Sequence, residues 1–175
     1  MTINGITIKG LKKSSGHEGG YCQGTVYLDG KKLGFWSQDA WGGPDSYDST
    51  EMYEKLAERA KSYQSGFPDS YKFKDVLDSP DVLLGELVQF MDEEKTYKKY
   101  AKQGYPVMLL VATNYSCAMQ FFRQPQTDAV YAQCAAKLAE RFKGKPYQTA
   151  VFTDISEFNL VCDAEHPIDS KFFRP

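Results

Sequence analysis

Three runs within the first forty residues alternate apolar and polar positions with a period of two, which is typical of β-strands. Residues 3–8 form one alternating run, and residues 21–28 and 31–38 form two more on either side of Asp29-Gly30. An Asp-Gly pair between two such runs favours a two-residue type I′ turn, because both turn residues must tolerate positive φ. The sequence therefore predicts an antiparallel β-hairpin.

A two-residue turn fixes the register of the hairpin and hence its two faces. Leu28 is expected opposite Lys31, with Val26 opposite Leu33. The face predicted to pack on the core carries Cys22, Val26, Leu28, Leu33 and Phe35. The other face carries Tyr21, Gln23, Thr25, Tyr27, Trp36 and Gln38. We expect this polar and aromatic face either to be covered by another element or to serve as a binding platform.

Three later stretches have the 3.6-residue period of helices. Asp48 is expected to cap the first, which ends before Gly66 and Pro68. Ser79-Pro80 begins the second, and a more charged stretch over 93–102 is taken as its continuation. Thr127 caps the third, over 128–143. The apolar positions of the first two are Met52, Leu56, Ala60, Tyr63, Leu83, Leu84, Leu87, Val88 and Met91.

Residues 106–113, 118–123 and 147–153 are strand candidates, and residues 114–116 read as the turn between the first two. The predicted fold class is α+β. An N-terminal antiparallel β-hairpin packs with helices and is followed by a C-terminal ββαβ-like half. Because no repeat or low-complexity linker interrupts the chain, we expect a single domain over 1–175, with a weak seam near residue 104.

Composition and charge narrow the function classes. The formal net charge is −2, which is too small for electrostatic capture of nucleic acid or of a membrane surface. The first residues lack the pattern of a signal peptide, and the longest apolar run is too short to cross a bilayer. The four cysteines form no CxxC pair and no zinc-ligand spacing. We expect a cytoplasmic protein with reduced thiols and without a metal or cofactor.

Support for catalysis is weak. His17 and Glu18 are an adjacent acid–base pair in a glycine-rich loop, where such residues are commonly solvent-exposed and idle. No nucleophile elbow, phosphate-binding loop or metalloprotease helix motif is present. An enzyme is therefore less expected than a binding protein, and a buried structural role is expected for Cys117 and Cys134.

The loop over residues 37–47 is the most unusual local feature and the candidate ligand site. Gly42 and Gly43 can expose backbone amides as an anion-binding nest. The side chains that could stack on or hydrogen-bond a ligand are Trp36, Gln38, Asp39, Trp41, Asp45 and Tyr47. In the alternative interpretation, Trp41 fills the core, the glycines make a turn, and Asp39 caps backbone amides.

A second polar and aromatic cluster could complete this site if the two halves of the chain close on each other. Its members are Asn114, Tyr115, Gln120, Phe122 and Arg123. Arg123 is the cation of this cluster that could contact a phosphate, and the alternative is an ordinary surface arginine.

Residues 24–34, with Asp-Gly-Lys at the turn, and residues 37–45, with Asp-Ala-Trp-Gly-Gly-Pro, carry a family resemblance. They resemble an uncharacterised family of small bacteriophage and integrated-element proteins. These share a hairpin with a D-G-K turn, followed by a D-x-x-G-G-P turn and helices. The resemblance extends to a strand hairpin and helix over 108–142, and Gln38 replaces a common asparagine. It implies a mobile-element origin and action in the host cytoplasm, and it implies no catalytic residues.

Three functions remain open on these observations. The first is a non-enzymatic counter-defence protein that sequesters a small anionic, nucleotide-like signal, as a homo-oligomer with pockets at subunit boundaries. The second is an inhibitor or adaptor that binds a host protein through the aromatic hairpin face. The third is a nucleotide-acting enzyme that uses His17 and Glu18. Direct binding of nucleic acid is not expected.

Overall fold

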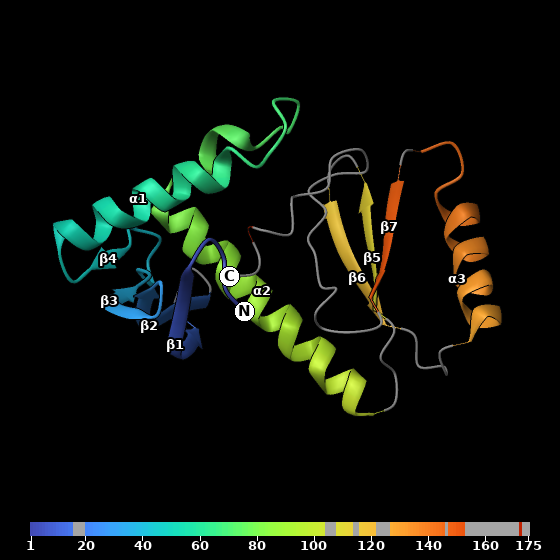
Figure 1. Cartoon of the computed structure of the whole chain (residues 1–175), viewed down its shortest axis with the longest axis horizontal. Helices are drawn as coiled ribbons and strands as arrows, with labels where there is room; N and C mark the ends of the chain where they lie inside the picture. The colour runs from blue at the N-terminus through green and yellow to red at the C-terminus, as the bar shows by residue number, and fades with distance from the viewer. Residues whose placement is uncertain are drawn as a thin grey trace. The chain divides into compact units, whose positions relative to one another are not determined.

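The computed structural model describes residues 1–15, 20–103, 108–113, 116–121, 127–145, 147–152 and Phe172 (Figure 1). Its class is α+β, as predicted. The elements are β1 (Ile6–Ser15), β2 (Gly20–Leu28), β3 (Lys31–Ser37), β4 (Ser46–Tyr47), α1 (Thr50–Gln64), a 3-10 turn (Lys74–Val76), α2 (Pro80–Lys102), β5 (Met108–Thr113), β6 (Ser116–Phe121), α3 (Asp128–Arg141) and β7 (Tyr147–Phe152).

Contacts between Cα atoms divide the chain into two compact units. The first holds Met1–Phe90 together with Phe172, and the second begins at Met91. The division falls inside α2, which contributes residues to both units. The weak seam expected near residue 104 was placed after this helix. The single domain over 1–175 stays a prediction.

The first unit is built on an antiparallel sheet in the order β1-β2-β3-β4. Asp29 and Gly30 have φ of 49° and 80°, and Leu28 pairs with Lys31, so the predicted two-residue turn is confirmed. The first strand was predicted over 3–8. It begins at Ile6 instead, because Asn4 and Gly5 form a tight turn with positive φ, and it continues to Ser15 opposite β2.

Beyond the turn, the predicted hairpin register is wrong by one residue. Val26 pairs with Gly34 instead of Leu33, because an extra residue on β3 forms a bulge between Lys32 and Gly34. The slip exchanges the two faces of β3. Trp36 is fully buried, and Phe35, predicted in the core, is 41% exposed.

Gly34 gives a physical reason for this register. A Cβ atom at this position would lie 2.5 Å from Sδ of Met52 on α1 and 3.1 Å from Cβ of Asp48. Only glycine therefore allows the start of α1 to lie this close to β3. With Gly34 turned toward the helix, Trp36 two residues later faces the same way and joins the core.

Helix α1 begins one residue later than predicted. Its N-cap is Ser49, whose hydroxyl accepts a hydrogen bond from the Met52 amide at 3.1 Å. Asp48, the predicted cap, instead accepts from the amide of Phe35 on β3. Its carboxylate therefore ties the helix entry to the sheet. The predicted apolar face is confirmed, since Met52, Leu56, Ala60 and Tyr63 are all buried.

Helix α2 starts at Pro80, as the Ser79-Pro80 pair predicts, and continues through the charged stretch to Lys102. Leu83, Leu84 and Leu87 are buried and belong to the core of the first unit, together with the buried residues of α1 and of the sheet. Phe172 closes this core at one end. Its ring lies edge-on to Tyr63, at 6.3 Å between centroids.

The second unit contains a three-stranded antiparallel sheet with β5 between β6 and β7. β6 begins at Ser116, which was expected in the turn. Thr127 caps α3 as predicted, with its hydroxyl accepting from the Val130 amide, and α3 ends two residues earlier than expected. Cys134 is buried on α3, and burial raises the pKa of its thiol, as expected of a structural cysteine.

Candidate functional site

The Gly-Gly nest of the predicted site is filled by a side chain of the same loop. The Asp39 carboxylate accepts hydrogen bonds from the amides of Trp41 at 3.1 Å and Gly43 at 3.0 Å. The Gly42 amide donates to the backbone carbonyl of Asp39 at 3.3 Å. All three amides that could hold an external anion therefore already bond to Asp39. This confirms the alternative interpretation of Asp39 as a cap.

Trp36 is held inside the fold rather than facing a ligand. It has no exposed surface, and its indole Nε1 donates to Oδ2 of Asp45 at 2.7 Å. Burial raises the pKa of the Asp45 carboxyl, the Trp36 bond opposes this rise, and nearby Asp81 adds to it. The ring of Trp36 cannot stack on a molecule from solvent, and Asp45 anchors the end of the loop.

Tyr47 joins the loop to the first turn of α2. Its hydroxyl donates a hydrogen bond to Oδ1 of Asp81, and its ring lies edge-on to Tyr53 at 5.4 Å. Burial, together with the bond to Asp81, raises the pKa of Tyr47 far above its ordinary value. The hydroxyl therefore stays protonated and acts as a fixed donor within the protein.

Gln38 and Trp41 differ in their surroundings: the Gln38 side chain is hydrogen-bonded within the fold, and the Trp41 side chain is exposed to solvent. The side-chain oxygen of Gln38 accepts a hydrogen bond from the backbone amide of Cys22 at 3.0 Å. The backbone amide of Gln38 in turn donates to the backbone carbonyl of Cys22. It therefore extends the pairing of the hairpin. Trp41 is 68% exposed, which overturns the alternative in which this ring fills the core. Of the aromatic rings predicted for the loop, Trp41 is the one presented to solvent.

The loop as a whole is a poor anion site, because Asp39, Asp45 and Asp81 place carboxylates in and beside it. The other predicted site residues lie outside the described part of the chain: Asn114, Tyr115, Phe122, Arg123, His17 and Glu18. Of Gln120 the structure gives the backbone position in β6.

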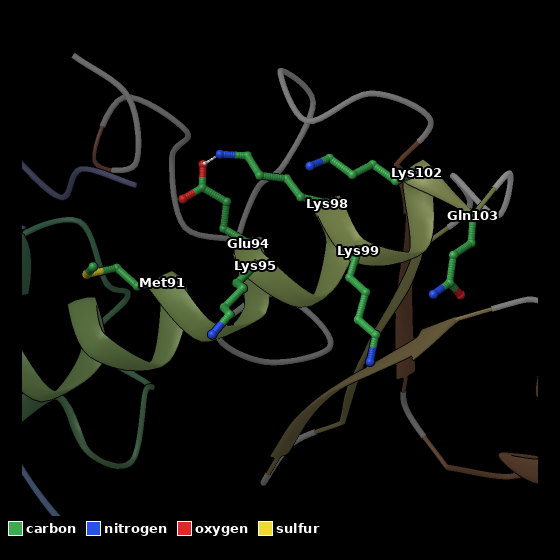
Figure 2. A pocket seen from close by; sticks show the side chains of 7 residues that line it. All are labelled: Met91, Glu94, Lys95, Lys98, Lys99, Lys102 and Gln103. Atoms are coloured by element: carbon green, nitrogen blue, oxygen red, sulfur yellow. Dashed lines mark hydrogen bonds and ion pairs between the residues drawn. The ribbon is translucent and has the colours of Figure 1, made fainter. Parts of the chain in front are cut away.

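A second candidate site lies along the C-terminal half of α2, within the second unit. Here seven side chains line a cavity of about 690 Å³ (Figure 2). Four are lysines, and the lining residues are Met91, Glu94, Lys95, Lys98, Lys99, Lys102 and Gln103. The volume falls within the range of small-molecule sites, roughly 300–1,000 Å³. We call this site the lysine cavity.

The electrostatics of the lysine cavity are positive. Lys98 pairs with Glu94 one turn before it, at 2.9 Å. Within the described residues, Lys95, Lys99 and Lys102 enter no ion pair. Among the described lining residues, four ammonium groups thus stand against one carboxylate, and only one of the four is paired with it. Such a cavity attracts an anion by direct charge interaction.

The spacing of the lysines in the sequence is a signal for this cavity. Positions 95, 98, 99 and 102 follow the i, i+3, i+4, i+7 spacing that gathers side chains on one side of a helix. Lysines near a helix C-terminus are also favoured by the helix dipole, which accounts for Lys99 and Lys102 in the last turns. The dipole acts only there, so it accounts less well for Lys95.

The described residues show neither a metal cluster nor a membrane-spanning helix. Among the residues with described side chains, no three histidine, cysteine or acidic groups gather where a metal ion could be held. None of the described helices is long and apolar enough to cross a membrane.

No protein-family model, curated protein or solved structure matches the chain. The proposals below therefore rest on the residues and their geometry.

Proposed function

We propose that this protein is a non-enzymatic binding protein that captures a small anionic ligand in the lysine cavity. The observation that carries the proposal is that four lysines line one cavity, and that three of them form no ion pair within the described part of the chain. An anion entering this cavity meets cations whose charge the protein leaves uncompensated, so binding does not have to break existing ion pairs.

The surroundings favour a small ligand over a nucleic acid. Asp92, Glu93 and Glu94 directly precede the lysines on the same helix and limit the positive region to about two turns. A nucleic-acid footprint needs a wider basic surface than this. The described residues of the cavity lining include no paired nucleophile and base, which favours binding over catalysis.

The resemblance to phage and mobile-element proteins suggests a setting for this activity. A protein that holds a nucleotide-like signal without converting it would lower the free concentration of that signal in the host. Such counter-defence by sequestration is the role we propose, with the lysine cavity in place of the Gly-Gly loop as the anion site.

The test is a titration of the purified protein with ATP, ADP, AMP and a cyclic dinucleotide at low salt. A ligand present at one hundred times its dissociation constant raises the free energy of unfolding by about 2.7 kcal/mol, which a melting experiment detects. The expected result is a rise in Tm for at least one compound, which is recovered intact after denaturation. Recovery of a cleaved product would instead show an enzyme.

A matched pair of variants ties the binding to the cavity. Lys99→Ala should weaken the titration several-fold, because it removes a cation from the lining. Lys55→Ala is the control, since Lys55 lies on α1 outside the cavity and pairs with Glu51 at 2.6 Å. Equal affinities of both variants and the wild type, or no binding of any anion, would refute the proposal.

A second candidate function is binding of a host protein through the loop. The exposed Trp41 favours it, because large rings on a hydrogen-bonded loop are typical anchors of protein interfaces. A partner retained by wild type and by Lys99→Ala but lost by Trp41→Ala would support this function. Loss with Lys99→Ala alone would assign the contact to the lysine cavity.

A further inference from the structure

We infer that the ligand of the lysine cavity carries a chain of two or more phosphate groups rather than a single anionic group. This inference rests on the proposed function, because it names the ligand class of the same site.

The arrangement of the lysines along α2 is the first argument. All four lysines share one face of α2: Lys95 and Lys99, one turn apart, form one row, and Lys98 and Lys102 form a second row beside it. The side chains of the two rows extend in different directions from this face (Figure 2). Each pair has the i, i+4 spacing at which two side chains reach one group. The cavity therefore has two rows of two cations, and each row can hold one phosphate.

The distance along the helix between the first and the last of the four lysines is the second argument. Positions 95 and 102 are separated by roughly 10 Å along the axis, at about 1.5 Å per residue. A single phosphate could contact the ammonium groups at both ends only if the two lysine side chains bent toward each other, whereas a chain of phosphates can meet both without this. Each further phosphate then gains its own charge-assisted hydrogen bonds.

The two ends of the cavity differ in chemistry and orient such a chain. Met91 and Glu94 lie at the N-terminal end, and Lys102 and Gln103 at the other (Figure 2). Because Glu94 repels phosphate and already holds Lys98, the phosphates should lie toward Lys102. The apolar thioether of Met91 suits a less polar part of the ligand. A nucleoside polyphosphate and inorganic polyphosphate share the required chain.

The experiment measures dissociation constants of the wild-type protein for orthophosphate, pyrophosphate and tripolyphosphate at one ionic strength, with citrate as a compact trivalent anion. We expect at least a tenfold gain in affinity from orthophosphate to tripolyphosphate, and weaker binding of citrate than of tripolyphosphate. ATP separates the two sources: tighter binding of ATP than of tripolyphosphate indicates a nucleoside polyphosphate, and equal or weaker binding indicates inorganic polyphosphate. Both outcomes support a phosphate chain.

Variants that remove one row at a time give the decisive comparison. The double variant K98A/K102A keeps the row of Lys95 and Lys99, and K95A/K99A keeps the other row. Each should lower tripolyphosphate affinity at least tenfold and orthophosphate affinity about twofold, since one phosphate needs one row. Lys55→Ala should change neither.

Equal affinities for orthophosphate and tripolyphosphate, or equal losses for both in the row variants, would overturn the inference and leave the proposed function standing. Absence of binding for every phosphate compound, ATP and citrate would refute the proposed function itself.

Discussion

Oδ2 of Asp39 accepts a hydrogen bond from the Gly43 amide at 3.0 Å, and a Cβ atom on residue 43 would lie 2.2 Å from the same oxygen. The two residues are therefore coupled. Asp39 closes the loop because Gly43 has no side chain, and Gly43 is required because Asp39 closes the loop. The loop forms its turn around an internal carboxylate, which explains why glycine stands here without any external anion.

A double-mutant cycle measures this coupling. Asp39→Ala should lower the free energy of unfolding by about 1 kcal/mol, because the hydrogen bonds from two backbone amides to the carboxylate are replaced by hydrogen bonds to water. Gly43→Ala should destabilise by a similar or larger amount in the wild type and by much less in the Asp39→Ala background, where the clash is absent. Chemical denaturation of the four proteins gives the coupling.

Gly42 is the control for that cycle. Its φ is +79° and nothing lies within 4 Å of its Cβ position, so Gly42→Ala strains the backbone without touching Asp39. Its destabilisation of about 1 kcal/mol should be the same in both backgrounds. A Gly43→Ala effect that is equally independent of Asp39 would contradict the coupling.

Asp45→Asn should change how stability depends on pH. The folded-state pKa of Asp45 is raised above its ordinary value of 3.8, chiefly by burial. The folded protein therefore binds more protons than the unfolded chain just above pH 3.8, and wild-type stability falls as pH rises through the raised pKa. Asparagine cannot titrate and can still accept from Trp36. The variant should gain stability relative to wild type across this window and keep the gain at higher pH.

Asp69→Asn is the comparison with the opposite sign. Asp69 pairs with Lys74 at 2.7 Å, and this bond lowers the pKa of its carboxyl. Wild-type stability from this pair is present above the ordinary pKa and is lost as pH falls through the lowered value, so Asp69→Asn should lose stability at neutral pH. Urea unfolding of both variants between pH 3 and 7 checks the signs. A pH-independent difference for Asp45→Asn would contradict its raised pKa.

Local signals in the sequence predicted most element boundaries, but they did not predict which side chains of β3 point into the core. Asp29-Gly30 fixed the turn, and Ser79-Pro80 and Thr127 fixed helix starts, because each is a short-range effect of backbone geometry. The bulge before Gly34 depends on the close approach of Met52, which lies on α1, outside the hairpin. Alternation alone could not reveal it, and so Trp36 and Phe35 were assigned to the wrong faces.

The prediction of an anion site at the Gly42-Gly43 loop was wrong for a related reason. The Gly42-Gly43 pair correctly indicated backbone amides gathered for an anion, but composition could not show that Asp39 is that anion. The lysine spacing over 95–102 was visible in the sequence. Its meaning depended on a cavity beside the helix, which only the folded arrangement supplies.

Glu94→Gln tests the role of the acid among the described residues of the lysine cavity. The Glu94 carboxylate holds Lys98 at 2.9 Å and opposes the charge of the ligand. The substitution frees Lys98 and removes a repulsive charge, so affinity for tripolyphosphate should rise several-fold. Glu51→Gln breaks the equivalent pair with Lys55 on α1 and should leave affinity unchanged. Titration calorimetry compares the two, and an equal effect of both would show that only net charge matters.

The two tryptophans of the chain should respond oppositely to substitution. Trp36 is fully buried and bonded to Asp45, so Trp36→Ala should destabilise by about 3–5 kcal/mol. Trp41 is 68% exposed, so Trp41→Ala should change the free energy of unfolding by about 0.5 kcal/mol or less. Because the chain has only these two, each single-tryptophan variant also reports on one ring by fluorescence.

Trp36→Phe leaves Trp41 as the emitter, and Trp41→Phe leaves Trp36. Acrylamide should quench the first variant strongly and the second weakly, and the emission maximum of the first should lie at longer wavelength, as expected of a solvated indole. Trp36→Phe also tests the Asp45 bond separately from ring packing, since phenylalanine fills most of the space without the Nε1 donor. Equal quenching of the two variants would contradict the register of β3, because a one-residue slip would bring Trp36 back to the outer face.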